Sequence, residues 1–121
     1  MKRILNLTQH PATEVQIADG VIEPSAELKN EIKNMITFEE MPTKDEMKEV
    51  AKKLVTFVKD ANCDSAMIGG AMFFMSTLEN ALKDAGITPC YAFSKRRCEE
   101  KEINGVVKKI SLFEYIGLIE I

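Results

Sequence analysis

The order of its apolar segments is the feature that most constrains the fold of this chain. A short β-favouring run at residues 3–7 is followed by helical patterns, and a buried-type strand is expected at residues 65–68. A helix from about residue 71 and a third strand at residues 89–93 come next. Strands and helices in this order build a parallel sheet through right-handed crossovers. The sequence therefore predicts an α/β fold, specifically a Rossmann-like three-layer sandwich with a central, mostly parallel sheet.

Capping signals indicate where the helices begin. A short helix is expected over residues 13–18, and Pro24-Ser25 starts a second one. Thr43 with Glu46 matches a capping box ahead of the best-defined helix. The helix that follows Gly69-Gly70 has two possible starts, at Ala71 or at Ser76, because Ser76 and Glu79 also match a capping box.

The last third of the chain carries a hairpin signal. Asn104-Gly105 is the strongest short hairpin signal, and it joins residues 98–103 to residues 106–112. The four residues 94–97 are predicted to form a loop, and residues 115–121 a final strand. The hairpin and the final strand extend the sheet, antiparallel in part. Residues 1–121 contain no repeat and no linker, so we expect a single α/β domain.

Charge and hydropathy exclude several functional classes. The net charge is −3, so no general basic field attracts duplex nucleic acid, and an anionic ligand needs a local basic cluster. The apolar stretches are shorter than the roughly 20 residues that span a bilayer. The start, Met1-Lys2-Arg3, is not followed by the long apolar region of a signal peptide. We therefore expect a cytoplasmic protein with no membrane partner.

The cysteines argue against a metal site and against disulfides. Cys63, Cys90 and Cys98 are odd in number, have no CxxC spacing, and are accompanied by His10 as the single histidine. This set does not match the usual zinc ligand patterns. We predict reduced thiols, two of them buried, and neither a metal ion nor another cofactor.

Three short polar or glycine-rich segments follow the three predicted parallel strands. They are Thr8-Gln9-His10, Gly69-Gly70 and Ser94-Lys95-Arg96. Ligands of open α/β sheets bind beyond the carboxyl ends of the strands, and parallel strands end at the same edge. The sequence therefore predicts that these segments converge on one binding site.

Each segment suits an anionic ligand, and each has a simpler explanation. Gly69-Gly70 lets backbone N–H groups approach a phosphate, but a tight turn needs the same residues. Lys95 and Arg96 suit phosphate oxygens, or they are a solvated loop. His10 is the side chain that titrates near neutral pH, and it either contacts ligand, acts as a catalytic acid or base, or satisfies local backbone groups.

Met72 and Phe73 are large apolar side chains on an otherwise polar helix face if that helix begins at Ala71. In that position they need a base to stack on, another subunit, or a covering loop. If the helix begins later, both are ordinary core residues.

Three motifs resemble known proteins: residues 4–13 (Ile-Leu-Asn-Leu-Thr-Gln-His-Pro-Ala-Thr), residues 67–71 (Met-Ile-Gly-Gly-Ala) and residues 91–96 (Tyr-Ala-Phe-Ser-Lys-Arg). Together they resemble a family of small uncharacterised bacterial and phage proteins over nearly the whole chain. The first motif is also similar to the small Rossmann-like ring nucleases of CRISPR systems. Those proteins resemble CARF domains, which bind cyclic oligoadenylate at strand ends across a dimer.

The resemblance and the strand-end segments lead to three hypotheses. The first is a homodimeric module that binds a nucleotide or cyclic-nucleotide signal in phage defence or its evasion. The second is a metal-independent ring nuclease at the same site, with His10 as acid or base and Lys95 or Arg96 stabilising charge. The third is a protein-binding module that uses Met72 and Phe73 and takes no small ligand.

Overall fold

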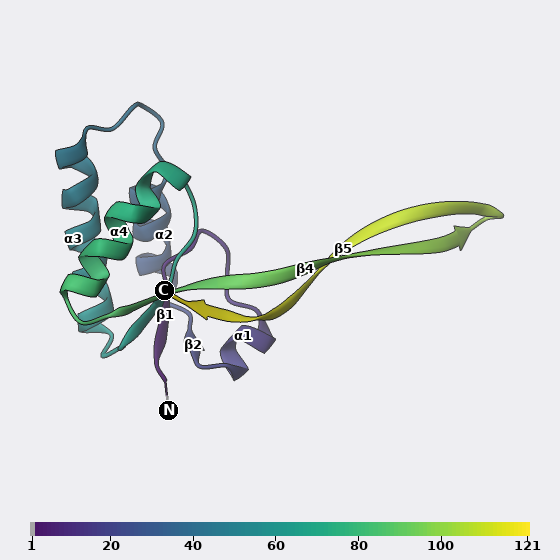
Figure 1. Ribbon diagram of the computed structural model, residues 1–121, viewed down its shortest axis with the longest axis horizontal. Coiled ribbons are helices and arrows are strands. Elements are labelled where there is room, and N and C mark those ends of the chain that lie inside the picture. The colour runs from purple at the N-terminus through teal and green to yellow at the C-terminus, as the bar shows by residue number, and fades with distance from the viewer. Residues whose placement is uncertain (1) are drawn as a thin grey trace.

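The computed structural model describes residues 2–121, which form four helices around one five-stranded sheet (Figure 1). In chain order the elements are β1 Ile4–Asn6, α1 Glu14–Ala18, β2 Val21–Ile22, α2 Ala26–Ile36, α3 Lys44–Asp60, β3 Ser65–Met67, α4 Met72–Asp84, β4 Thr88–Ile103 and β5 Val106–Glu120.

The strands are ordered β2-β1-β3-β4-β5 across the sheet. β1 pairs in parallel with β2 on one side and with β3 on the other, and β3 pairs in parallel with β4. Only β5 is antiparallel, to β4. The chain therefore leaves β1 towards β2 and then crosses back over β1 to reach β3. The two-residue β2 was not predicted, since it is too short to show a periodic pattern.

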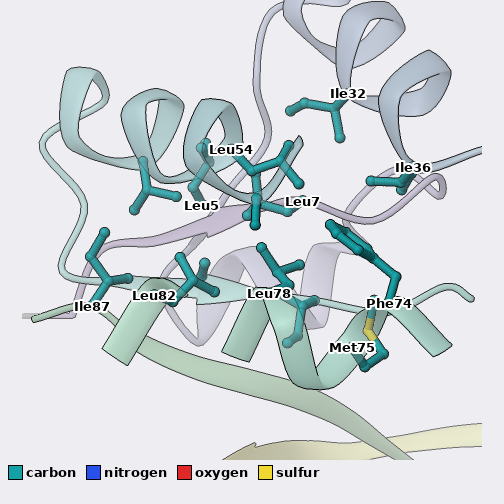
Figure 2. Close-up of a cluster of buried hydrophobic side chains, with 14 of the residues drawn as sticks. Leu5, Leu7, Ile32, Ile36, Leu54, Phe74, Met75, Leu78, Leu82 and Ile87 are labelled. Carbon is teal, nitrogen blue, oxygen red and sulfur yellow. The ribbon is translucent and has the colours of Figure 1, made fainter. Parts of the chain in front are cut away.

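Most of the core lies on one face of the sheet, beneath α2, α3 and α4. Figure 2 shows Leu5 and Leu7 from the first strand segment packed among side chains of these three helices, including Leu54 and Phe74. A smaller cluster of Ile4, Val21 and Met67 lies on the opposite face. The apolar periodicity of the sequence thus marks the buried faces correctly.

The mixed α/β architecture and the mostly parallel sheet are confirmed, whereas a Rossmann-like three-layer sandwich is not. The second face of the sheet carries α1, which has five residues, while α2, α3 and α4 all lie over the first face (Figure 1). Within residues 2–121, every helix is too short or too polar to cross a membrane.

The expected helix starts are confirmed by the capping contacts. The hydroxyls of Thr13, Ser25 and Thr43 each accept a hydrogen bond from a backbone N–H in the first turn of α1, α2 and α3. The fourth helix begins at Met72, so the early start is confirmed and the alternative start at Ser76 is wrong.

The C-terminal third departs from the prediction. The Asn104-Gly105 turn is confirmed, but β4 continues through residues 94–97, which were expected to form a loop. The expected final strand is likewise part of the long β5. The pairing of β4 with β5 has one register shift, between Phe93 and Ser94 of β4. No proline or glycine breaks residues 94–103, so pairing with β5 extends the strand to the turn. The two strands form an arm that projects far from the rest of the molecule (Figure 1).

The thiols provide a test of this fold. Cys63 and Cys90 are buried, as predicted for two of the three, and Cys98 is exposed on the arm. Burial raises the pKa of the Cys63 and Cys90 thiols, which lowers the thiolate fraction that reacts. We expect a thiol reagent to modify Cys98 quickly in the native protein and all three cysteines after unfolding. A single reactive thiol after unfolding without reductant would instead indicate a disulfide.

Candidate functional site

A cavity of about 660 Å³ lies at the carboxyl ends of β1 and β3. Its lining includes Ile68, which follows β3, and residues of the loops that follow both strands. Two of the three predicted segments meet there. The lining residues are Thr8, Gln9, His10, Pro11, Thr13, Gln16, Ile36, Thr37, Phe38, Ile68, Gly69, Gly70, Ala71, Tyr91 and Ala92.

Asn6, the last residue of β1, fixes the loop that carries Thr8, Gln9 and His10. Its side chain is fully buried, and its Oδ1 accepts hydrogen bonds from the Thr8 N–H (2.9 Å) and the Thr8 hydroxyl (2.7 Å). Its Nδ2 donates to the His10 carbonyl at 2.8 Å and to Glu23 Oε1 at 2.8 Å. The loop is therefore held by one side chain at both of its ends.

Glu23 and Lys29 complete this polar network. Lys29 Nζ donates to the His10 carbonyl at 2.6 Å and lies 3.4 Å from Glu23 Oε1. The lysine comes from α2, so the loop after β1 is tied to a helix that packs on the sheet. The Lys29 side chain is mostly buried, and its charge is paired with the Glu23 carboxylate behind the loop that lines the cavity.

Two further contacts define the walls of the cavity. Gln9 Nε2 donates to the Thr37 hydroxyl at 3.1 Å, which joins the loop to the end of α2. The Tyr91 hydroxyl donates a short hydrogen bond of 2.5 Å to Glu79 Oε2 of α4. Burial, followed by this bond to a carboxylate, raises the pKa of the Tyr91 phenol above its ordinary value.

The Gly69-Gly70 turn lines the cavity and leads into α4. Gly70 has φ +136°, a conformation that residues with a Cβ rarely adopt. Ala71 precedes α4 and offers no side chain to cap it, so the first N–H groups of this helix have no side-chain acceptor. Such N–H groups carry partial positive charge and suit a phosphate.

Met72 and Phe73 do not line this cavity. Met72 is 90% exposed and Phe73 is 56% exposed at the start of α4. The Phe73 ring lies 5.3 Å, centroid to centroid, from Phe38, in the loop between α2 and α3. A covering loop was one of the partners expected for Phe73, and Phe38 of that loop covers part of its ring. Met72 remains almost fully exposed.

Ser94, Lys95 and Arg96 also lie outside the cavity. They belong to β4, where Lys95 is opposite Glu114 and Arg96 donates to the Ser111 hydroxyl at 3.1 Å. The preceding Ala92 does line the cavity. The prediction that all three segments converge through strand ends is therefore wrong for this one, because its strand does not end there.

The comparison with known families concerns nearly the whole chain. Residues 2–118 match the model of the Uncharacterized protein MJ1673 family. The chain belongs to this family. Searches of curated proteins and of solved structures gave no match. The family description assigns no activity, so the proposals for this member depend on its own residues.

Sequence reasoning missed the buried support of the cavity in this member of the family. Asn6, Glu23 and Lys29 lie behind the lining residues and were not predicted. One signal was present, since an asparagine inside the apolar run Ile-Leu-Asn-Leu is unusual for a buried strand. Within residues 2–121, no group of three or more histidine, cysteine or acidic residues is placed to hold a metal ion.

Proposed function

We propose that this chain binds a nucleotide or cyclic-nucleotide signal in the cavity at the carboxyl ends of β1 and β3. The observation that carries the proposal is the coincidence of this cavity with the reversal of strand order at β1. In open α/β sheets the crevice at such a reversal is where ligands bind, because neighbouring connections leave in opposite directions and open a gap.

The chemistry of the lining supports a phosphate-bearing ligand. Backbone N–H groups at Gly70 and at the start of α4 would donate to phosphate oxygens, and Gly70 permits the close approach. Gln9 and Thr8 would meet polar edges of the base or sugar. Behind the loop, the positive charge of Lys29 is paired with Glu23, so the backbone N–H groups would be the main partners of a phosphate. A Rossmann-like relationship to CARF domains, and with it a role in phage defence or its evasion, belongs to the same proposal.

Basic residues of the β4–β5 arm would contact a long ligand but not a short one. Lys95 lies about 10 Å beyond the lining residue Ala92, at about 3.3 Å per residue of strand. Ser94, Lys95 and Arg96 would therefore contact a ligand that extends out of the cavity, such as an oligonucleotide. Phe73, which is exposed outside the cavity, would stack on a base of such a ligand, and Met72 would add an apolar contact.

An enzymatic version of the proposal depends on His10. Its imidazole lines the cavity beside Thr8 and Gln9, where it could act as acid or base on a bound cyclic oligonucleotide. Ring opening would join the attacking 2′-oxygen to phosphorus and release the 5′-oxygen as an alcohol, without a metal ion. Analysis of products after long incubation separates binding from cleavage, and His10→Ala should abolish only cleavage.

We expect thermal denaturation to detect the ligand within a panel of cyclic mono-, di- and oligonucleotides. A ligand that binds only the folded state adds about 2.7 kcal/mol of stability at about a hundredfold excess over Kd. For a chain of this size the melting temperature rises by several degrees. Free phosphate should give a smaller shift, and added salt should reduce both shifts.

Matched variants localise the ligand. Gln9→Glu adds a negative charge at the cavity and should abolish the shift, whereas Asn80→Asp, on the exposed face of α4, should not. Lys95→Glu and Arg96→Glu should weaken oligonucleotides more than mononucleotides, with Lys52→Glu on α3 as their control. If no nucleotide shifts the melting temperature at low salt, nucleotide binding is wrong, and a protein partner at Met72 and Phe73 becomes the better hypothesis.

A further inference from the structure

The β4–β5 arm lacks the support that a two-stranded ribbon normally needs. Beyond Cys90, β4 has no partner other than β5, and β5 is the edge of the sheet. The arm projects away from all four helices (Figure 1). An isolated hairpin is marginally stable in water, and stability usually requires three or more strands or a helix packed on one face. A further strand, or a helix packed on one face, would supply this missing support.

The two edges of the arm differ in character. In β4, residues 95–102 contain seven charged side chains, a composition that discourages strand addition. β5 instead carries exposed apolar side chains. Phe113 is 76% exposed, and Val106, Val107, Leu112 and Ile116 are also exposed. An exposed apolar edge strand is a pairing surface. The edge of β5 is thus the one suited to a new strand.

The turn determines which backbone N–H and C=O groups of β5 make no hydrogen bond to β4. Asn104 and Gly105 both have positive φ, 53° and 78°, as in a type I′ turn. Such a turn makes Ile103 and Val106 a hydrogen-bonded pair, and hydrogen-bonded pairs then alternate along the arm. The N–H and C=O groups of residues 107, 109, 111, 113 and 115 consequently point to the open edge.

A second copy of the chain fits this edge in one register. Two identical antiparallel strands related by a twofold axis must place one residue opposite its own copy. With Ser111 at the axis, Lys108 lies opposite Glu114 of the second copy, and Ile110 lies opposite its Leu112. Moving the axis to residue 110 or residue 112 places Glu114 opposite Val106 or Ile110 and leaves Lys108 opposite an apolar residue. The register centred on Ser111 also places Lys109 opposite Phe113, but of these three registers it is the one that pairs opposite charges across the strands. Cross-strand pairs of opposite charge stabilise a sheet.

We infer that two copies of the chain associate through their β5 edges, with Ser111 opposite Ser111, into one four-stranded antiparallel sheet. The order across this sheet is β4, β5, β5 of the second copy, then its β4. The interface joins backbone groups of residues 107–115 from both copies and places the apolar side chains of β5 beside those of the second copy on each face of the sheet. It goes beyond the proposed function by naming the surface and register of the dimer, and it requires no ligand.

Disulfide trapping tests the register. Opposite residues in a hydrogen-bonded antiparallel pair have Cα atoms about 5.5 Å apart. This distance lies within the range of about 4.4–6.8 Å that a disulfide spans. Cys98 must first be changed to serine, because its Sγ lies 4.0 Å from the Ser111 Oγ of the same chain and would capture a new thiol there. We expect Cys98→Ser/Ser111→Cys to form a covalent dimer under mild oxidation.

The native cysteine serves as the control. An association through β4 centred on residue 98 would bring two Cys98 thiols together and would pair Arg97 with Glu99. Oxidation of the unmodified chain should therefore give no covalent dimer. Rapid dimer formation through Cys98, or a persistent monomer in the Ser111→Cys variant, would overturn the inference.

Charge exchange gives an independent measurement. Lys108→Glu places two carboxylates opposite each other twice in the dimer and should raise its dissociation constant about tenfold. Adding Glu114→Lys should restore association, and Lys109→Glu, opposite Phe113, should change it little. Circular dichroism checks that each variant keeps the fold. A wild-type chain that is monomeric by light scattering at high concentration refutes the dimer while leaving ligand binding untouched.

Discussion

Truncation of Leu54 to alanine is expected to lower the free energy of unfolding by about 2–5 kcal/mol. Leu54 is 0% exposed in the middle of α3, where it packs with Leu5, Leu7 and Phe74 (Figure 2). The loss combines removed apolar contacts with the cavity left behind. Chemical denaturation should report a lower midpoint with an unchanged slope.

Phe73 is the matched comparison, because it is larger but lies on the surface. Phe73→Ala removes the ring that contacts Phe38. We expect the free energy of unfolding to fall by less than about 1 kcal/mol. A larger loss at Phe73 than at Leu54 would mean that the start of α4 is part of the core. In that case Phe73 would be a core residue, and its proposed role in ligand binding would be wrong.

Replacement of Asn6 with leucine is expected to destabilise the protein by about 2–4 kcal/mol, although leucine is apolar and of similar size. The side-chain amide of Asn6 makes four hydrogen bonds, to Thr8, His10 and Glu23. Leucine would remove the acceptor of the Thr8 N–H, and it would leave the His10 carbonyl and the Glu23 carboxylate with one hydrogen bond fewer each. Denaturant titration gives the loss, and hydrogen exchange at Thr8 should increase because its N–H loses its acceptor.

Asn34→Leu, on the exposed side of α2, is the control for this substitution and should leave stability nearly unchanged. Thr8→Val should have an intermediate effect, since it removes one hydroxyl from the same network. If Asn6→Leu is neutral, the loop after β1 is held by Lys29 and Gln9 instead. The proposed role of Asn6 in shaping the cavity would then be wrong.

Many elements of this fold could be predicted because their causes are local. The hydroxyls of Thr13, Ser25 and Thr43 cap helices through contacts three residues away. The Asn104-Gly105 turn depends on two adjacent residues that accept positive φ. The buried face of α3 follows from apolar spacing within one segment.

Part of the candidate site could also be predicted, because parallel strands end at one edge. Thr8, Gln9, His10, Gly69 and Gly70 line one cavity, as the two strand ends implied. Whether they bind a nucleotide is still a proposal. The convergence itself required only that both strands be parallel neighbours.

Other properties depend on contacts between distant residues, and the sequence alone does not determine them. Residues 94–97 form strand because residues 112–115 pair with them, so the basic segment lies on an arm and not in a strand-end loop. Asn6 bonds Glu23, and shares the His10 carbonyl with Lys29, only in the folded chain, where α2 is packed on the sheet. Local patterns thus determined where helices, turns and buried faces lie. The strand order, the length of the arm and the polar network behind the cavity were decided by tertiary pairing, because a backbone group or a buried amide takes whichever partner the folded chain places opposite it.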